Sequence, residues 1–301
     1  MKQLIRKILR TFARRDETPY PSLSAGTPYP SLSAAEILNR NRDFNARRKF
    51  KQDVYADLLS PYIGNFENLT LIEYVRETEI GDRKILLIRH DIDHDYQTAL
   101  KIAQWEYQHG LKTTYCVLHT AWYYGYLEKG RIIHTQNLVD LCKRLVDLGH
   151  EVNLHNNLVV TALTEDVSPA DLLSQELDFF NSIGIRITGT ASHGDKLCHQ
   201  LNFRNWELFK ECSDNRFGGH RVISFKHKGK IREVMLGEMS MFDFGLEYEG
   251  YDIMRDVYHT ESGGRLRTRH NARGRRPFGR KDLTKGSVIG VLTHPEWWEF
   301  S

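Results

Sequence analysis

Strand-like and helix-like segments alternate along the chain from Lys84 to about residue 292, and this alternation limits the possible folds more than any other feature. Short apolar runs predict strands, and apolar residues spaced three or four apart predict the helices between them. Successive strands that are joined through helices form a parallel sheet or barrel. The pattern therefore predicts an α/β protein.

The boundaries follow from local signals. Ser168 and Pro169 are typical of a helix start, and Gly184 is typical of a helix end. The expected helices are residues 95–109, 134–148, 168–183 and 204–212. The expected strands are residues 84–88, 113–118, 151–154, 186–191 and 287–292, with shorter strands near 221–225 and 231–236.

Charged residues follow the apolar strand 84–88 at once. Asp91 and Asp93 should point the same way, because side chains repeat every second residue in a strand. Two neighbouring carboxylates repel each other, so we expect a cation to hold one of them while the other titrates. The alternative is an ordinary strand-to-helix turn in which an aspartate caps the helix.

Histidines follow three other predicted strands: His155, His193 and His294. The carboxyl ends of parallel strands meet at one edge, so these side chains should gather near Asp91 and Asp93. A single histidine at a strand end is usually structural, but several beside paired carboxylates favour a site. Aspartate with imidazoles and without thiolates suits a divalent metal, such as zinc, with an open coordination position.

Four ordered motifs resemble those of the polysaccharide deacetylase superfamily: His90-Asp-Ile-Asp93, Gly149-His-Glu-Val-Asn-Leu-His155, Ser192-His-Gly194 and Leu292-Thr-His-Pro295. The segments Glu261-Ser-Gly-Gly-Arg265 and His294-Pro-Glu-Trp-Trp298 are similar to a branch found in bacterial O-antigen and capsule biosynthesis. The resemblance covers about residues 80–298. It implies a distorted (β/α)7-type barrel and a metal-dependent hydrolase that removes an acyl group, usually acetyl, from an N-acylated sugar.

The resemblance also implies residue roles. Asp91 matches the catalytic base and His294 the catalytic acid, whereas Asp93 and His155 match metal ligands. The family's second ligand histidine, four residues after the first, is replaced here by Val159. The third ligand is therefore expected to be His193 or, second in order, Asn157. If neither binds metal, the alternative is a catalytically silent, carbohydrate-binding relative.

Further residues are candidates for binding the substrate. Trp297 and Trp298 could stack on a sugar or pack in the core. The arginine-rich segment 263–281 contains no acid and suits bidentate contacts to phosphate, as in a nucleotide-linked or lipid-pyrophosphate-linked sugar. A solvated loop and a nucleic-acid-binding segment are the alternatives, and the latter is disfavoured because no nucleic-acid-binding motif is present. The full set of substrate-binding candidates is His90, Asn157, Glu261, Arg265, Trp297 and Trp298.

The N-terminal segment differs from the rest. Residues 1–15 are basic and amphipathic, which suits a peripheral contact with an anionic membrane or, equally, a solvated or partner-docked tail. Residues 18–35 contain a nine-residue duplication, Thr-Pro-Tyr-Pro-Ser-Leu-Ser-Ala-Gly/Ala, that predicts an extended spacer. We therefore expect a flexible segment at 1–35 and a single deacetylase-like domain at 36–301.

Bulk properties restrict little else. The chain has 301 residues and 40% hydrophobic content, so it can build a large core. Its net charge of +3 is too small to indicate a particular kind of binding partner. Its cysteines form no C-x-x-C pair, which favours buried, reduced thiols in a cytoplasmic protein. No segment has the length of a membrane span or the pattern of a signal peptide.

Overall fold

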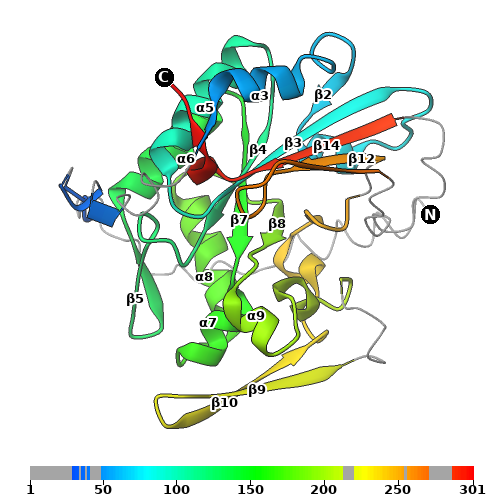
Figure 1. Ribbon diagram of the computed structural model, residues 1–301. Coiled ribbons are helices and arrows are strands. Elements are labelled where there is room, and N and C mark those ends of the chain that lie inside the picture. The colour runs from blue at the N-terminus through cyan, green and yellow to red at the C-terminus, as the bar shows by residue number, and fades with distance from the viewer. Residues whose placement is uncertain are drawn as a thin grey trace. The chain divides into compact units, whose positions relative to one another are not determined.

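A curled half-barrel sheet organises the fold, with helices packed along it (Figure 1). The computed structural model describes residues 29–33, 35–37, 39–40, 49–212, 220–253, 256–270 and 287–301. Residues 31–301 form one compact unit, to which the following description applies. The tail 1–15 and most of the predicted spacer 18–35 lie outside the described residues, as do residues 271–281 of the arginine-rich segment.

The strand order explains how distant segments meet. Neighbours along the sheet are parallel from β11 to β12, and β13 is antiparallel to β12. A short strand, β2 (Glu67–Leu69), pairs with the first half of β3. The order is β11 (Tyr248–Glu249), β8 (Gly189–Ser192), β7 (Glu151–Asn156), β4 (Thr114–Leu118), β3 (Lys84–Ile92), β14 (Ser287–Thr293), β12 (Val257–Thr260) and β13 (Arg267–His270).

The predicted α/β class is confirmed, whereas the distorted (β/α)7 barrel is not. The sheet is a curled half-barrel whose strand order ends at β11 and β13 among the described residues. The alternation of strands and α-helices also stops after β8 and the short helix that follows it, Lys196–Gln200. The chain from residue 201 onward uses 3-10 turns and short strands instead of α-helices among the residues described there.

Polar side chains cap several helices at their N-termini, and Ser168 is the cap that the sequence predicts. Asp95, Thr135 and Ser168 each accept a hydrogen bond from a backbone N–H three residues later, which satisfies a donor that the helix leaves free. The α-helices are α3 (Gln52–Leu59), α4 (Leu71–Arg76), α5 (Tyr96–Gln108), α6 (Gln136–Asp147), α7 (Leu158–Thr164), α8 (Pro169–Ser182) and α9 (Lys196–Gln200).

Smaller elements complete the unit. Among the described residues, three pairs of short strands lie outside the main sheet, and 3-10 turns connect several elements. The strand pairs are β1 (Phe50–Lys51) with β15 (Trp298–Glu299), β5 (Gly125–Glu128) with β6 (Arg131–His134), and β9 (Arg221–His227) with β10 (Lys230–Leu236). The 3-10 turns are η1 (Asn205–Leu208), η3 (Met241–Phe244) and η4 (Pro295–Trp297).

Two predicted elements differ from the structure. The expected helix at 204–212 is only the 3-10 turn η1, because Phe209 adopts extended backbone and pairs with Met239. The expected strand 186–191 begins at Gly189. A Cβ at Gly189 would overlap the Tyr248 ring, so glycine is needed where β11 crosses so closely.

Strand β3 is buried on both faces, as its apolar run predicts. Leu86 and Ile88 pack into one hydrophobic cluster, and Ile85 and Leu87 pack into another. The same alternation continues into the charged end of the strand. Arg89, Asp91 and Asp93 follow the odd-numbered face, whereas His90 follows the even-numbered face. This difference decides which of these residues can share a site.

The four cysteines are buried and form no disulfide bond with one another, as predicted. Within the described ranges, no helix combines the length and the apolar content that crossing a bilayer requires.

Candidate metal centre

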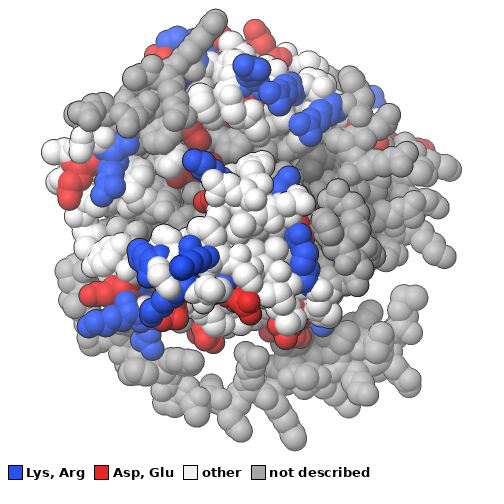
Figure 2. Space-filling view, turned by 60° about the horizontal axis from the view of Figure 1, so that its bottom comes forward, with Lys and Arg blue, Asp and Glu red and all other residues white. Residues whose placement is uncertain are grey.

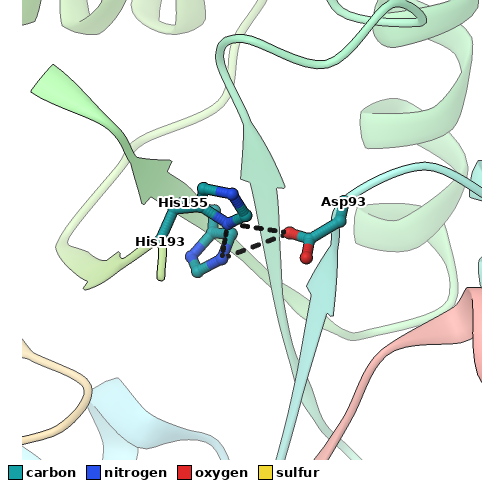
Figure 3. Close-up of side chains that lie close together, drawn as sticks. All are labelled: Asp93, His155 and His193. Carbon is teal, nitrogen blue, oxygen red and sulfur yellow. Dashed lines mark hydrogen bonds and ion pairs between the residues drawn. The ribbon is translucent and has the colours of Figure 1, made fainter. Parts of the chain in front are cut away.

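Three side chains from separate strands meet at one point (Figure 3). Asp93 follows β3, His155 lies in β7, and His193 follows β8. Because these strands are parallel, their carboxyl ends lie at the same edge, as the sequence predicts. Asp93, His155 and His193 could together hold a metal ion.

The spacing of the three facing atoms fits a small divalent ion. The His155 Nε2 and His193 Nδ1 atoms each lie 3.3 Å from Asp93 Oδ1, and they lie 3.2 Å from each other. Ligands of a tetrahedral zinc at about 2.0–2.1 Å would be separated by about 3.3–3.4 Å. The arrangement therefore needs little adjustment to bind zinc.

The tautomer of His155 supports the same interpretation. Its Nδ1 lies 2.8 Å from the Ala191 carbonyl oxygen and must donate a hydrogen to it, so Nε2 of the neutral ring carries only a lone pair. That lone pair faces Asp93 Oδ1, a buried oxygen that accepts no hydrogen bond of ordinary geometry from the described residues. A cation or a proton between the two atoms would remove the repulsion.

The electrostatics of the cluster are strong. Burial alone would raise the pKa of Asp93, but the imidazoles of His155 and His193 outweigh it and hold that pKa well below its usual value. Burial lowers the pKa of His193, but Asp93 reverses this effect and raises it. Asp93 is thus an ionised carboxylate, which is the form that binds a metal.

The structure brings His193, and not Asn157, into contact with the other two ligand candidates. The side chain of Asn157 is held by hydrogen bonds with Asp195 and Asn205. Val159, at the position of the family's second ligand histidine, is buried in α7. His193, which follows β8, is thus the third residue of the cluster with Asp93 and His155.

Asp91 lies beside this cluster and is paired with a buried arginine. Arg89 contacts both carboxylate oxygens of Asp91, at 3.0 and 3.1 Å, and its guanidinium lies 4.3 Å from the Tyr251 ring. Asp91 Oδ2 lies 3.8 Å from His155 Nε2. Burial would raise the pKa of Asp91, but Arg89, His155 and His294 together keep it below its ordinary value. The predicted cation that holds one carboxylate is therefore Arg89.

His294 faces Asp91 from the next strand, with its Nε2 4.0 Å from Asp91 Oδ2. Its other nitrogen, Nδ1, lies 3.0 Å from Glu261 Oε2, and its backbone N–H donates to Glu261 Oε1. Burial would lower the pKa of His294, but the Glu261 carboxylate raises it well above the ordinary value. His294 is thus held as an imidazolium whose Nε2 points toward the site.

The remaining substrate-binding candidates are dispersed. His90 points to the opposite face of β3, where it is fully buried between Glu106 and Thr293, so its assignment to the substrate site is corrected. Trp298 is also fully buried, which decides its role in favour of core packing. Arg265 is exposed, and Trp297 is partly buried.

Glu261 was expected to bind substrate, but it is completely buried and bonds His294 and the Trp298 indole N–H instead. Glu296 was not singled out by the sequence. It is buried, and its Oε2 has no hydrogen-bond partner among the residues that the structure describes. Burial together with the negative charge of Asp93 raises its pKa to about 8, although His294 opposes the shift. In the sequence, the position of Glu296 inside the motif His294-Pro-Glu-Trp-Trp298, next to Trp297, is a signal that could have marked it as a site residue.

Comparison with known proteins adds no assignment: no family model, curated protein or solved structure matches the chain. The site therefore rests on its own geometry. It combines a carboxylate with two imidazoles, a second carboxylate held by arginine, and a protonated histidine.

Proposed function

We propose that the protein is a metal-dependent hydrolase that removes an acyl group, most often acetyl, from an N-acylated sugar. The observation that carries this proposal is the position of Asp91. This ionised carboxylate lies beside the Asp93–His155–His193 cluster and 4.0 Å from the imidazole of His294. A base and an acid thus flank the candidate metal centre, as amide hydrolysis requires.

The donor set suits zinc, which would be held by Asp93, His155 and His193. A bound ion of this kind polarises a carbonyl group and lowers the pKa of water. The same ligands also occur with iron(II) in oxygenases. The adjacent acid–base pair favours hydrolysis, because an oxygenase does not need a charged Asp91 opposite a protonated His294.

Asp91 is suited to accept a proton from the attacking water. Arg89 keeps its carboxylate ionised near neutral pH. Arg89 donates a hydrogen bond to Oδ2 and lies within ion-pair distance of Oδ1, which restricts the orientation of the carboxylate. Arg89 is a positioning residue in this scheme, since it acts through Asp91.

His294 is suited to donate a proton to the departing nitrogen. An amine is a poor leaving group unless it is protonated, so an amide needs this acid more than an ester does. Glu261 raises the pKa of His294, which keeps the proton available near neutral pH. The side chain of His294 is 13% exposed, so the substrate can approach it.

The sugar is inferred from the motif resemblance, which indicates surface-polysaccharide biosynthesis on the cytoplasmic side of the membrane. Arg265 is exposed next to the Glu261 turn, so it is accessible to a phosphate of a nucleotide-linked or lipid-pyrophosphate-linked sugar. Partly buried Trp297 remains the candidate for stacking on the sugar ring.

The test combines metal analysis with assays on nucleotide-linked N-acetyl sugars. We expect about one zinc per chain in the wild type, loss of the metal in Asp93→Ala, and retention in Asp91→Asn with most of the rate lost. His294→Ala should retain metal and lose about 10²–10⁴-fold in rate on the amide. An activated aryl ester, whose leaving group needs no proton, should be affected much less.

Three results would contradict the proposal. Absence of metal under zinc-replete conditions would favour a silent carbohydrate-binding protein. Bound iron with oxygen consumption would indicate an oxygenase. Equal losses on amide and ester in His294→Ala would remove its role as the acid.

A further inference from the structure

The hairpin β9–β10 is a two-stranded sheet separate from the main sheet, and it projects at the bottom of Figure 1. Its turn is Lys228-Gly229, and both residues have positive φ, 50° and 79°, as a tight two-residue hairpin turn requires. One face of the hairpin packs on α7 through buried Ile223, Val234 and Leu236. The opposite face points outward.

The outward face is unusually apolar for an exposed surface. Val222 and Met235 lie opposite each other across the strands, and Ile231 lies opposite Lys226. These three apolar side chains are 48%, 43% and 69% exposed. Eight large apolar side chains are exposed in the described part of the chain, and three of them lie on this one short face. Scattered exposed apolar residues need no explanation, but a grouped set indicates a contact surface.

The hairpin carries more basic than acidic residues, and the strand pairing divides them between its faces. Lys226 and Glu233 lie on the outward face, Lys228 lies in the turn, and Lys230 lies in register with the residues that face α7. Between residues 221 and 236 there are five basic residues and one acid, Glu233, which is bonded to Ser224. Lys228 and Lys230 lie 3.6 and 3.7 Å from Glu165 and Asp166, but these pairs are solvent-exposed and hold the lysines only weakly. Figure 2, in which the bottom of Figure 1 comes forward, shows a group of lysine and arginine side chains with acidic side chains beside them.

We propose that the outward face of the β9–β10 hairpin docks on an anionic lipid bilayer. Lys226 on this face and Lys228 in the turn would contact the headgroups. Ile231, Val222 and Met235 would enter the interface between headgroups and acyl chains. A second copy of the chain is a poorer occupant, because the two hairpins would bring their lysines together. A nucleic acid is also disfavoured, since its bases stack on aromatic side chains and this face presents aliphatic ones.

The position of the hairpin links this surface to the candidate metal centre. Helix α7 begins two residues after β7, the strand that carries His155, and the hairpin packs on α7. The hairpin and His155 therefore lie on the carboxyl-end side of β7 (Figure 1). Docking would bring this side of the sheet toward the bilayer. The inference does not depend on the proposed hydrolase activity.

The test is flotation of the full-length protein with vesicles of phosphatidylcholine, with and without phosphatidylglycerol, at low and high salt. We expect binding only to the anionic vesicles and weakening by salt. The variant Lys226→Gln/Lys228→Gln/Lys230→Gln should bind roughly 100-fold more weakly, because each lysine contributes about five-fold near an anionic surface. Ile231→Ser/Met235→Ser should reduce binding by roughly ten-fold or more through the apolar contribution.

Matched controls change the same chemistry elsewhere. Lys129→Gln/Lys143→Gln/Lys196→Gln removes three exposed lysines, and Val146→Ser/Tyr107→Ser removes two exposed apolar side chains. Both controls should bind as the wild type does. All substituted side chains of the hairpin and of these controls are exposed, and unchanged melting temperatures check that the fold is intact.

Three outcomes would overturn the inference. The first is wild-type binding by both hairpin variants, with loss only in the tail variant Arg6→Gln/Lys7→Gln/Arg10→Gln. The second is failure of the wild type to bind anionic vesicles at low salt. The third is a wild-type dimer that Ile231→Ser/Met235→Ser converts to a monomer without any change in vesicle binding.

Discussion

Glu261 contacts His294 twice, through the backbone N–H and through the imidazole Nδ1. Both carboxylate oxygens are therefore engaged by a single residue, and the indole N–H of Trp298 adds a third donor. This relationship fixes the ring of His294 and stabilises its charged form. A change at Glu261 therefore tests directly whether His294 is the proton donor.

Replacing Glu261 with glutamine should lower the pKa of His294, because the main group that raises this pKa loses its charge. The imidazolium then loses its proton at lower pH, so the alkaline limb of the pH–rate profile should move to lower pH. NMR titration of the His294 ring measures the same shift without substrate. The exposed Glu299→Gln variant is the control. An unchanged titration would contradict the role of Glu261.

His193→Ala should remove a metal ligand and lower zinc affinity by well over about 100-fold, beyond the range for residues that only support ligands. Asn157→Ala changes a residue that lies outside the cluster and is bonded to Asp195 and Asn205. It should lower the affinity by no more than about 10–100-fold, the range of residues that support ligands. Competition with a chromogenic chelator measures both affinities. The reverse order would assign the third ligand to Asn157.

Arg89→Met should lower the free energy of unfolding by about 3–5 kcal/mol at neutral pH, because it leaves the fully buried Asp91 carboxylate without its cation. The cost should decrease at low pH, since Asp91 without Arg89 takes up a proton more readily. The double variant Arg89→Met/Asp91→Asn should recover part of the loss. Urea unfolding measures these effects. Arg83→Met, at a partly exposed ion pair, should cost at most about 1 kcal/mol.

Glu296→Gln should change how the stability of the metal-free protein depends on pH. The folded-state pKa of Glu296 is raised from 4.5 to about 8, so its protonated form is favoured by folding. Its contribution to stability is complete below pH 4.5 and is lost as the pH rises to about 8. The variant lacks this loss, so its stability relative to wild type should increase by up to about 1.4 kcal/mol per pH unit in that window. A flat difference, as expected for exposed Glu299→Gln, would show that Glu296 is ionised throughout.

Trp298→Ala should lower the free energy of unfolding by about 3–5 kcal/mol, because the fully buried ring packs against Tyr55 and Phe50. Trp297→Ala should cost less, since this ring is only partly buried. If Trp297 stacks on the sugar, its variant should weaken substrate binding while the protein remains folded. Equal losses of stability in the two variants would contradict this division.

The positions of Asp91, Asp93, His155, His193 and His294 could be predicted because each follows an apolar strand, and strand polarity alone brings such ends to one edge. The face of each side chain was harder to predict. His90 is adjacent to Asp91 in the sequence, yet the two-residue period of the strand turns it toward Glu106. That partner lies on α5 and is recognisable only after the helix has packed on the strand.

The parts that could not be predicted depend on tertiary contacts. Helix propensity favoured a helix at 204–212, but pairing of Phe209 with Met239 imposes extended backbone. The role of Glu261 depends on where the turn after β12 meets the end of β14, and no local pattern contains that information. Burial of Glu296, which raises its pKa, is likewise a property of the assembled fold.

Asp93, His155 and His193 come from β3, β7 and β8, and β4 lies between the first two of these strands. An ion bound by all three would therefore be a removable cross-link that spans four strands and closes two long loops of the chain. Such a link stabilises the folded state, because its three ligands come together only in the fold and binding free energy is added to folding free energy. Chelation should then accelerate amide hydrogen exchange at the carboxyl ends of β4 and β7, far more than in helices such as α3 on the outside of the sheet.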